Sequence, residues 1–114
     1  MNDCLFCRIV EKSLPSRKIY EDDQCLAFED INPQARVHIL VIPKRHLSSL
    51  ADAQESDTAL MGHLMIICAK IARERDIEQS GYRVVANTGR GAGQSVFHLH
   101  FHVLGGRMFH WPPG

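Results

Sequence analysis

Apolar residues recur along the chain in patterns that predict a short helix, several strands and one long helix. Residues 4–16, CLFCRIVEKSLPS, predict a short helix that ends near Pro15. Residues 18–33, KIYEDDQCLAFEDINP, predict two strands joined by the acidic turn EDDQ and followed by a turn at NP. The apolar run VHILVI at 37–42 predicts a buried strand that stops at Pro43.

The second half of the chain contains the most strongly periodic segment, residues 52–77. Apolar side chains recur there at helical spacing in two rows: Leu60, Leu64, Ile67 and Ile71, and Met61, Met65 and Cys68. This spacing predicts a long helix, with Asp52 or Ser56 as the expected N-cap. Residues 82–89 predict a strand, 89–95 a glycine-rich loop, and 95–105 a further strand.

The order of these elements predicts an α+β fold in which hairpin-linked antiparallel strands carry the long helix on one face. The length, 114 residues, favours a single domain that spans residues 1–114. Lys and Arg number 13, as do Asp and Glu, so the formal net charge is zero. This balance argues against a nucleic-acid-binding protein, which typically carries a basic excess.

Two further absences bear on where the protein works. No apolar run reaches the roughly 18 residues that a membrane span needs. The first residues, MNDCLFCRIVEK, lack the basic start and long apolar stretch of a signal peptide. We therefore expect a cytoplasmic protein, without a membrane partner, whose thiols are reduced.

The segment SVFHLHFHV places His98, His100 and His102 at every second position. Alternate residues of a strand point to one face, so these imidazoles share a face while Phe97, Leu99, Phe101 and Val103 point into a core. Three interpretations compete: a polar surface strand, a zinc site built from neutral imidazoles, and nucleophilic catalysis. An imidazole with a pKa near 6.5 can attack phosphorus or carry a proton at neutral pH.

The glycine-rich stretch NTGRGAGQS leads directly into the histidine segment. Gly89, Gly91 and Gly93 allow backbone N–H groups to approach an anion, and Gln94 and Ser95 add side-chain donors. A tight turn explains the glycines equally well, and no Walker A sequence is present. The position next to three histidines favours a phosphate-binding loop beside a nucleophile.

The four cysteines divide into two kinds. Cys25 and Cys68 have apolar neighbours and are expected to be buried. Cys4 and Cys7 form a C-x-x-C pair, which is typical of half a metal site or of a redox pair. A redox pair usually opens a helix that follows a strand, and no strand is predicted before Cys4, so a metal site is favoured.

Together these segments resemble the histidine triad (HIT) family, and in particular its Hint branch of nucleoside phosphoramidate hydrolases. The family signature His-x-His-x-His stands here as HLHFHVL. The matching blocks cover nearly the whole chain and read YEDDQCLAFEDINPQA, HILVIPKRH, GYRVVANTG, GQSVFHLHFHVLGGR and HWPPG. The resemblance implies a HIT-like fold: an antiparallel five-stranded sheet with one long and one short helix, continued across a homodimer.

The resemblance also implies roles for individual residues in hydrolysis of a purine nucleoside phosphoramidate. His100 matches the nucleophile that becomes a nucleotidyl-histidine, His102 contacts phosphate oxygens, and His98 and His38 support the site. Ser95 matches a donor to the leaving group and Asp30 the carboxylate that holds the ribose hydroxyls. The phosphate loop is matched by Asn87, Gly93 and Ser95, and the wall of the purine pocket by Leu5, Phe6, Ile9, Phe28 and Ile31. Trp111 matches a tail residue that reaches the partner's active site in Hint dimers.

The N-terminal cysteines depart from many Hint proteins. In other HIT branches such a pair joins two histidines in a structural zinc site, and the matching set here is Cys4, Cys7, His46 and His98. The family needs no metal for catalysis, so any zinc is expected to be structural. Two alternative functions remain open: a dinucleotide polyphosphate hydrolase or nucleotidylyltransferase of a sister branch, and a nucleotide-binding signalling or scaffold protein. A metal-dependent hydrolase is a third.

Overall fold

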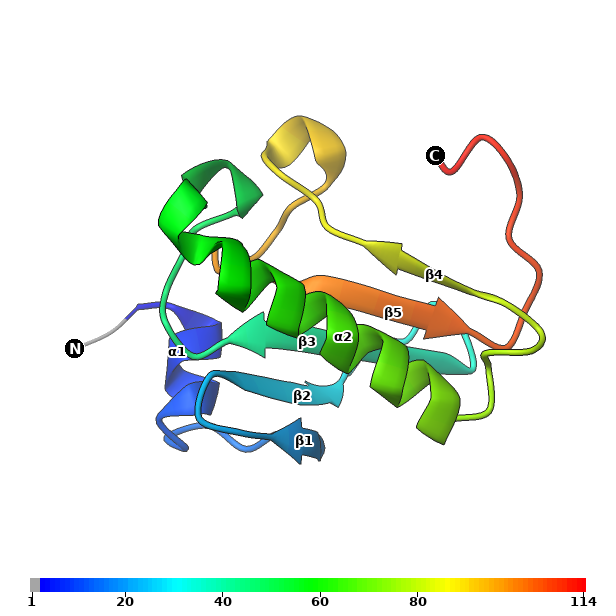
Figure 1. The fold of residues 1–114 in the computed structure, drawn as a ribbon, viewed down its shortest axis with the longest axis horizontal. Helices are drawn as coiled ribbons and strands as arrows, with labels where there is room; N and C mark the ends of the chain where they lie inside the picture. The colour runs from blue at the N-terminus through cyan, green and yellow to red at the C-terminus, as the bar shows by residue number, and fades with distance from the viewer. Residues whose placement is uncertain (1–2) are drawn as a thin grey trace.

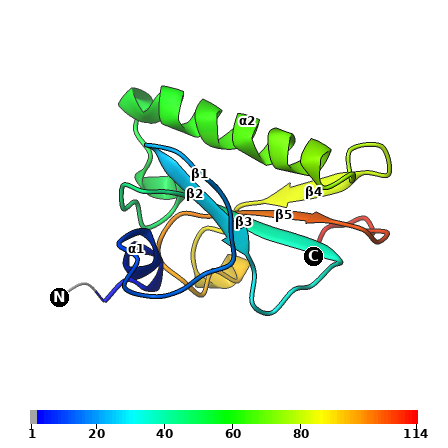
Figure 2. The ribbon, with the colours of Figure 1, turned by 90° about the horizontal axis from the view of Figure 1, so that it is seen from below.

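A five-stranded antiparallel sheet lies between a long helix and a short one (Figures 1 and 2) in the computed structural model, which describes residues 3–114. The strand order is β1-β2-β3-β5-β4, and every neighbouring pair is antiparallel. This arrangement confirms the predicted α+β fold with its five-stranded sheet. The elements along the chain are α1 Leu5–Val10, β1 Lys18–Glu21, β2 Cys25–Glu29, β3 Val37–Pro43, α2 Thr58–Glu74, β4 Tyr82–Val85 and β5 Phe101–Gly105, with 3₁₀ turns at Leu50–Asp52, Glu55–Asp57 and Arg90–Ala92.

The central strand β3 is buried on both faces, because each face of the sheet is covered by a helix (Figure 2). Toward α2 lies the larger core, in which Ile39 and Val41 pack with the buried row of the helix. Toward α1 lies a smaller cluster formed by Phe6, Leu26, Phe28, Leu40 and Ile42. Burial on both sides explains why β3 reads as a continuous apolar run instead of an alternating one.

The long helix is shorter than predicted: it spans Thr58–Glu74, and two 3₁₀ turns precede it. Its N-cap is Asp57, not the predicted Asp52 or Ser56. The Asp57 side chain makes no cap hydrogen bond to α2; its carboxylate accepts from the Gln54 N–H and pairs with Arg45. Of the two predicted apolar rows, Leu64, Ile67, Cys68 and Ile71 are buried against the sheet, Leu60 and Met61 are half-buried, and Met65 is exposed. No helix within residues 3–114 is long and apolar enough to cross a membrane.

Strand β5 begins at Phe101, so the predicted strand over 95–105 is too long at its start. Val41 pairs with Phe101, and the next positions of β3 lead to Pro43, which has no N–H to continue the ladder. The alternation nevertheless persists, since Leu99 and Phe101 lie in the α2 core. Phe97 does not follow it: its side chain is exposed, and the prediction that it points into the core is wrong.

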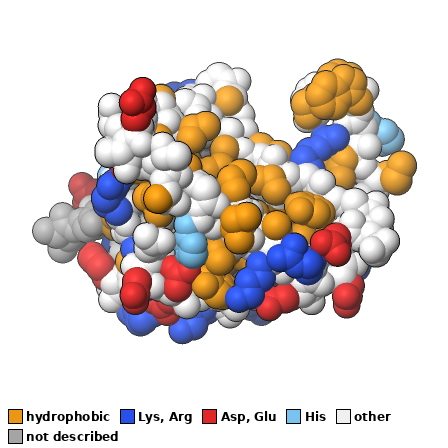
Figure 3. Space-filling view, viewed as in Figure 1, with side chains coloured by type: hydrophobic (Ala, Val, Ile, Leu, Met, Phe, Trp, Pro, Cys, Tyr) orange, Lys and Arg blue, Asp and Glu red, His pale blue; other side chains and the backbone are white. Residues whose placement is uncertain are grey.

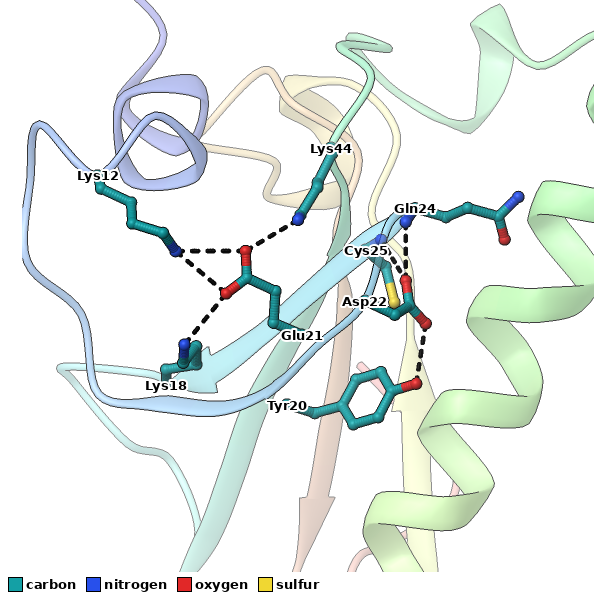
Figure 4. Close-up of polar contacts among 8 residues, drawn as sticks. All are labelled: Lys12, Lys18, Tyr20, Glu21, Asp22, Gln24, Cys25 and Lys44. Atoms are coloured by element: carbon teal, nitrogen blue, oxygen red, sulfur yellow. Dashed lines mark hydrogen bonds and ion pairs between the residues drawn. The ribbon is translucent and has the colours of Figure 1, made fainter.

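The turn between β1 and β2 is held by Asp22, whose carboxylate accepts four hydrogen bonds, those from Tyr20, Gln24 and Cys25 being drawn in Figure 4. Oδ1 accepts from the backbone N–H groups of Gln24 and Cys25, and Oδ2 accepts from the Tyr20 hydroxyl and from His63 Nε2 on α2. Burial opposes ionisation of Asp22, but these donors together lower its pKa below the usual value. The turn is thereby tied to α2.

A second polar cluster lies on the other side of the same strand, where three lysines surround Glu21 (Figure 4). The ammonium groups of Lys44, Lys12 and Lys18 lie 2.8, 3.1 and 3.1 Å from its carboxylate oxygens. They lower the pKa of Glu21 to about 2. The cluster joins the segment after α1 to strand β1 and to the residue that follows β3.

Candidate active site

Four imidazoles converge where β3 lies beside the chain that enters β5. His38 comes from β3, His102 from β5, and His98 and His100 from the irregular segment just before β5. The ring centres of His38 and His102 lie 5.1 Å apart, and those of His100 and His102 lie 4.9 Å apart. His38, His98 and His100 are buried and His102 is half-buried. The structure therefore brings together all four histidines that the sequence had pointed to.

Backbone carbonyl groups determine which nitrogen of His98 and of His100 carries a proton. A carbonyl oxygen only accepts, so each ring nitrogen bonded to one is an N–H donor. His98 Nε2 donates to the Pro43 carbonyl at 2.8 Å, and His100 Nδ1 donates to the His98 carbonyl at 2.7 Å. In neutral His100 the lone pair therefore lies on Nε2, which is the atom that a nucleophilic histidine uses.

A second chain of hydrogen bonds orients His102. The backbone N–H of Gln34 donates to His38 Nδ1 at 3.0 Å, so His38 carries its proton on Nε2. The His38 Nε2–H donates to His102 Nδ1 at 2.8 Å. Asp30 Oδ2 lies 3.4 Å from His38 Nε2. Neutral His102 consequently carries its proton on Nε2 and can donate it to an oxygen of a bound ligand. Gln34 and Pro43 escaped sequence reasoning because both act through backbone atoms.

Burial favours the neutral forms of His102, His98 and His38. Burial, reinforced by the neighbouring His100 and His38, lowers the pKa of His102 to about 4. Burial likewise lowers the pKa values of His98 and His38, and in His38 the nearby Asp30 carboxylate partly opposes this effect. In their neutral forms, His102 can accept the bond from His38 and His98 keeps the lone pair that metal binding requires.

A cavity of about 640 Å³ opens beside the histidines, between α1 and the ends of β2 and β3. Of the predicted nucleotide-binding residues, Ile9, Phe28, Asp30 and Ile31 line it, as does His38, which was predicted to support catalysis. The cavity walls that the sequence did not single out are Pro15, Ser16, Arg17, Glu29, Pro33 and Arg36. Its volume falls within the range of small-molecule sites, and its apolar wall is suited to a flat ring.

The other two predicted purine-pocket residues, Leu5 and Phe6, do not line this cavity. Phe6 is buried behind the wall, where its ring packs edge-on against Phe28 at 5.4 Å and against His100 at 5.1 Å. Leu5 is largely exposed. Trp111, in the C-terminal tail, has 84% of its surface exposed and stands apart from the four imidazoles of the same chain.

The glycine-rich loop lies on the α1 side of the sheet, the side of the histidines (Figure 2). Gly93 has a φ of +92°, in the left-handed region that glycine adopts without strain. Buried Gln94 accepts from the backbone of Gly89 and donates to the carbonyls of Ser48 and Val96. Both amide hydrogens of Gln94 are thus engaged, so this side chain braces the loop and is not the anion donor that the sequence suggested.

The two loop residues predicted to contact a nucleotide lie on either side of that brace. Ser95 follows Gln94 and is exposed, and Asn87, at the end of β4, is half-buried. Both side chains carry polar groups beside the histidine segment. Their exposure leaves them accessible to a ligand.

Cys4, Cys7, His46 and His98 form a separate cluster in which the four ligand atoms lie within 4.8 Å of one another. His98 Nδ1 lies 3.3 Å from Cys4 Sγ and 3.1 Å from His46 Nδ1, and Cys7 Sγ lies 3.3 Å from His46 Nδ1. Tetrahedral zinc with two sulfur and two nitrogen ligands has ligand–ligand separations of about 3.3–3.8 Å.

The protonation of His98 provides a second test of this fit. Its Nε2–H is engaged with Pro43, so its unprotonated Nδ1 faces the two thiols. Metal-bound histidines typically donate their second nitrogen to a carbonyl in this way. Since both the donor set and the spacing suit zinc, the predicted ligands fit the metal.

This chain is similar in sequence and in structure to known proteins of one family. The HIT domain family model matches residues 11–109. An uncharacterized HIT-like protein of Synechocystis is 49% identical over 112 residues, which cover 98% of this chain and 97% of that protein. A HIT family hydrolase from Legionella pneumophila superposes with a TM-score of 0.97 at 43% identity, covering 98% of this chain and all of the other.

A zinc-bound histidine triad family protein from Mycobacterium smegmatis is also similar, with a TM-score of 0.78, 39% identity, and coverage of 92% of this chain and 76% of the other. The chain therefore belongs to the HIT domain family. Solved relatives of this chain include two described as HIT family hydrolases, from Legionella pneumophila and Clostridium thermocellum.

Proposed function

We propose that this protein is a purine nucleoside phosphoramidate hydrolase of the Hint type, which releases AMP or GMP from an amine. The observation that carries the proposal is the pair of opposite tautomers at the site. His100 presents an unprotonated Nε2, held by the His98 carbonyl, and His102 presents a protonated Nε2, held by His38. A nucleophile thus stands beside a donor for phosphoryl oxygens.

The reaction would proceed in two displacements at phosphorus. His100 Nε2 forms a bond to the α-phosphorus while the P–N bond breaks, and the departing amine takes up a proton. Water then attacks the nucleotidyl-histidine, the P–Nε2 bond breaks, and the nucleoside monophosphate leaves. His102 Nε2–H and the loop N–H groups would stabilise the developing charge on oxygen, and Ser95 is the proposed donor to the leaving nitrogen.

The cavity would hold the nucleoside. Ile9, Phe28 and Ile31 would line an apolar slot for the base, and Asp30, which lines the same cavity, would offer a carboxylate to the ribose hydroxyls. His38 connects this carboxylate to His102, because its Nε2 contacts both Asp30 and His102. A ligand anchored at Asp30 would therefore extend toward the nucleophile.

We assign zinc at Cys4, Cys7, His46 and His98 a structural role. Zinc bound there would cross-link α1 to the segments around His46 and His98. It would take no part in the reaction at phosphorus. The His98 ring is turned toward the thiols, whereas its carbonyl is turned toward His100, so the metal ligands and the nucleophile lie on opposite sides of one residue.

We further propose that the chain, as one domain over 1–114, forms a homodimer through β4 and α2. β4 is an edge of the sheet, where backbone groups can pair with a second copy. Met65, Ile66 and Tyr82 expose apolar surface nearby, and apolar side chains gather along α2 on that face (Figure 3). Light scattering should give twice the mass of one chain, and Ile66→Lys should shift the protein toward the monomer.

The test of catalysis is AMP release from an adenosine phosphoramidate. His100→Ala should lower kcat by about 10⁴-fold or more while AMP binding stays measurable, and wild-type protein quenched early should carry one AMP. His63→Gln, on the α2 side of the sheet, is the matched control. Retained turnover in His100→Ala, or faster cleavage of a diadenosine polyphosphate than of the phosphoramidate, would contradict the proposal.

A further inference from the structure

We propose that Cys4 and Cys7 are an oxidation site: a hydroperoxide converts them to a disulfide, which frees α1 and weakens nucleotide binding. This inference rests on the proposed function, because the affected pocket is the nucleotide pocket assigned above. It joins the two interpretations of the C-x-x-C pair that the sequence left open. The same two sulfurs serve as metal ligands when reduced and as a redox pair when oxidised.

The position of the two thiols meets the requirement for a redox pair. Cys4 is the N-cap of α1 and Cys7 lies in its first turn, with the Cys7 backbone N–H 3.3 Å from Cys4 Sγ. The two sulfurs lie within 4.8 Å of each other, so small side-chain rotations suffice to join them. Cys4 is partly exposed, which gives a small oxidant access.

Helix α1 is held on the sheet by the packing of Phe6 and, at its first turn, by this cluster. It has six residues, fewer than the roughly 12–15 that an isolated helix needs to be even marginally stable in water. Cys4 and Cys7 hold its first turn against His98 and His46. Because a disulfide directs both sulfurs toward each other, these contacts to the imidazoles are lost.

The lost contacts lie next to the nucleotide pocket. Between the two cysteines, Phe6 packs edge-on against Phe28 in the pocket wall and against the ring of His100. Ile9, one turn later, lines the cavity itself. A shift of the first turn of α1 therefore moves one wall of the purine slot.

His98 connects the thiols to the nucleophile directly. Its ring contacts both sulfurs, at 3.3 Å and 3.5 Å, and its carbonyl accepts the bond that fixes the tautomer of His100. Loss of the sulfur contacts removes two of the partners that hold this residue. Oxidation is therefore expected to reach both substrate binding and the orientation of His100.

The chemistry balances with hydrogen peroxide as the oxidant. One cysteine sulfur attacks a peroxide oxygen, the O–O bond breaks, and a sulfenic acid and water form. The second sulfur attacks the sulfenic sulfur, its S–O bond breaks, an S–S bond forms, and a second water leaves. Two thiols are oxidised, one peroxide is reduced, and a thiol reductant reverses the change.

The experiment treats the purified protein, with any bound metal, with excess hydrogen peroxide and measures three quantities. Peptide mass analysis identifies the disulfide, calorimetry gives the Kd for AMP, and hydrogen exchange reports on residues 4–10. We expect a Cys4–Cys7 disulfide, an AMP Kd raised by about tenfold, faster exchange in α1, and recovery of all three with dithiothreitol.

Two variants provide matched controls. Cys4→Ser should lose the peroxide response, and Cys68→Ala should keep it, because burial raises the pKa of the Cys68 thiol to about 12 and leaves it unreactive. If Cys4→Ser does not fold, reversal by dithiothreitol in the wild type decides. A disulfide without change in α1 exchange, or no Cys4–Cys7 disulfide at all, overturns the inference. Failure of the reduced protein to bind AMP would instead contradict the proposed function, and α1 exchange would still test the switch.

Discussion

Acidification should destabilise the fold through His102 at a higher pH than that at which the contributions of Glu21 and Asp57 are lost. Burial lowers the pKa of His102 from its usual 6.5 to about 4, so the native protein resists a proton that the unfolded chain accepts. The stability that this group contributes is fully present above pH 6.5 and is lost as the pH falls toward 4. At about pH 5, where the unfolded imidazole is almost fully protonated and the native one is not, the loss is about 2 kcal/mol.

Urea unfolding at about pH 7.5 and about pH 5 measures this loss, and His102→Gln isolates it. We expect the free energy of unfolding to fall by about 2 kcal/mol more in the wild type than in the variant. His98 and His38, whose pKa values are also lowered, add losses of the same sign to both proteins.

The carboxylates do not confuse the result, because they titrate in a lower range. The lowered pKa values of Glu21 and Asp57 mean that their contributions are lost only below their unfolded values of 4.5 and 3.8. An equal pH dependence in wild type and His102→Gln would show that burial does not hold His102 neutral. A charged His102 carries protons on both ring nitrogens, so its Nδ1 could not accept the bond from His38 Nε2–H.

Three further outcomes are expected from separate parts of the molecule. Gly105→Ala should lower the free energy of unfolding, measured in urea, by about 1–3 kcal/mol, because the new Cβ would lie 2.6 Å from Ile77 Cδ1. Gly62→Ala, in open space within α2, should raise it by about 0.5–1 kcal/mol. Dialysis against a chelator should release zinc and lower the melting temperature of the wild type, but leave that of Cys7→Ser unchanged. The same treatment should leave kcat for phosphoramidate cleavage within a few-fold of its starting value, and its loss in still-folded protein would point to a catalytic metal.

The parts of the fold that the sequence predicted are those set by apolar periodicity. The run from Val37 to Ile42 had to be a buried strand, and the row that includes Leu64 and Ile71 had to face a sheet. The grouping of the histidines followed from strand alternation, although two of the three precede the strand. Alternation survives there because Leu99 is still buried in the α2 core.

The features that escaped prediction depend on backbone atoms from distant segments. The Gln34 N–H and the Pro43 carbonyl orient His38 and His98, and neither side chain signals such a role. Gln94 was expected to face an anion, but its amide meets Ser48 carbonyl from a loop 46 positions away in the chain. Local sequence patterns carry no information about such partners, so tertiary structure alone reveals them.

Pro43 shows how the end of a strand can set up the chemistry of a site. Because it has no N–H, the ladder between β3 and β5 stops there, and the chain before Phe101 leaves strand geometry. The carbonyl of Pro43 is then available to His98 Nε2, and the carbonyl of His98 to His100 Nδ1, instead of being consumed by strand pairing. A ladder continued through these residues would engage the same carbonyls and leave the tautomer of His100 undetermined. The interruption of the strand is therefore a condition for a nucleophile with its lone pair on Nε2.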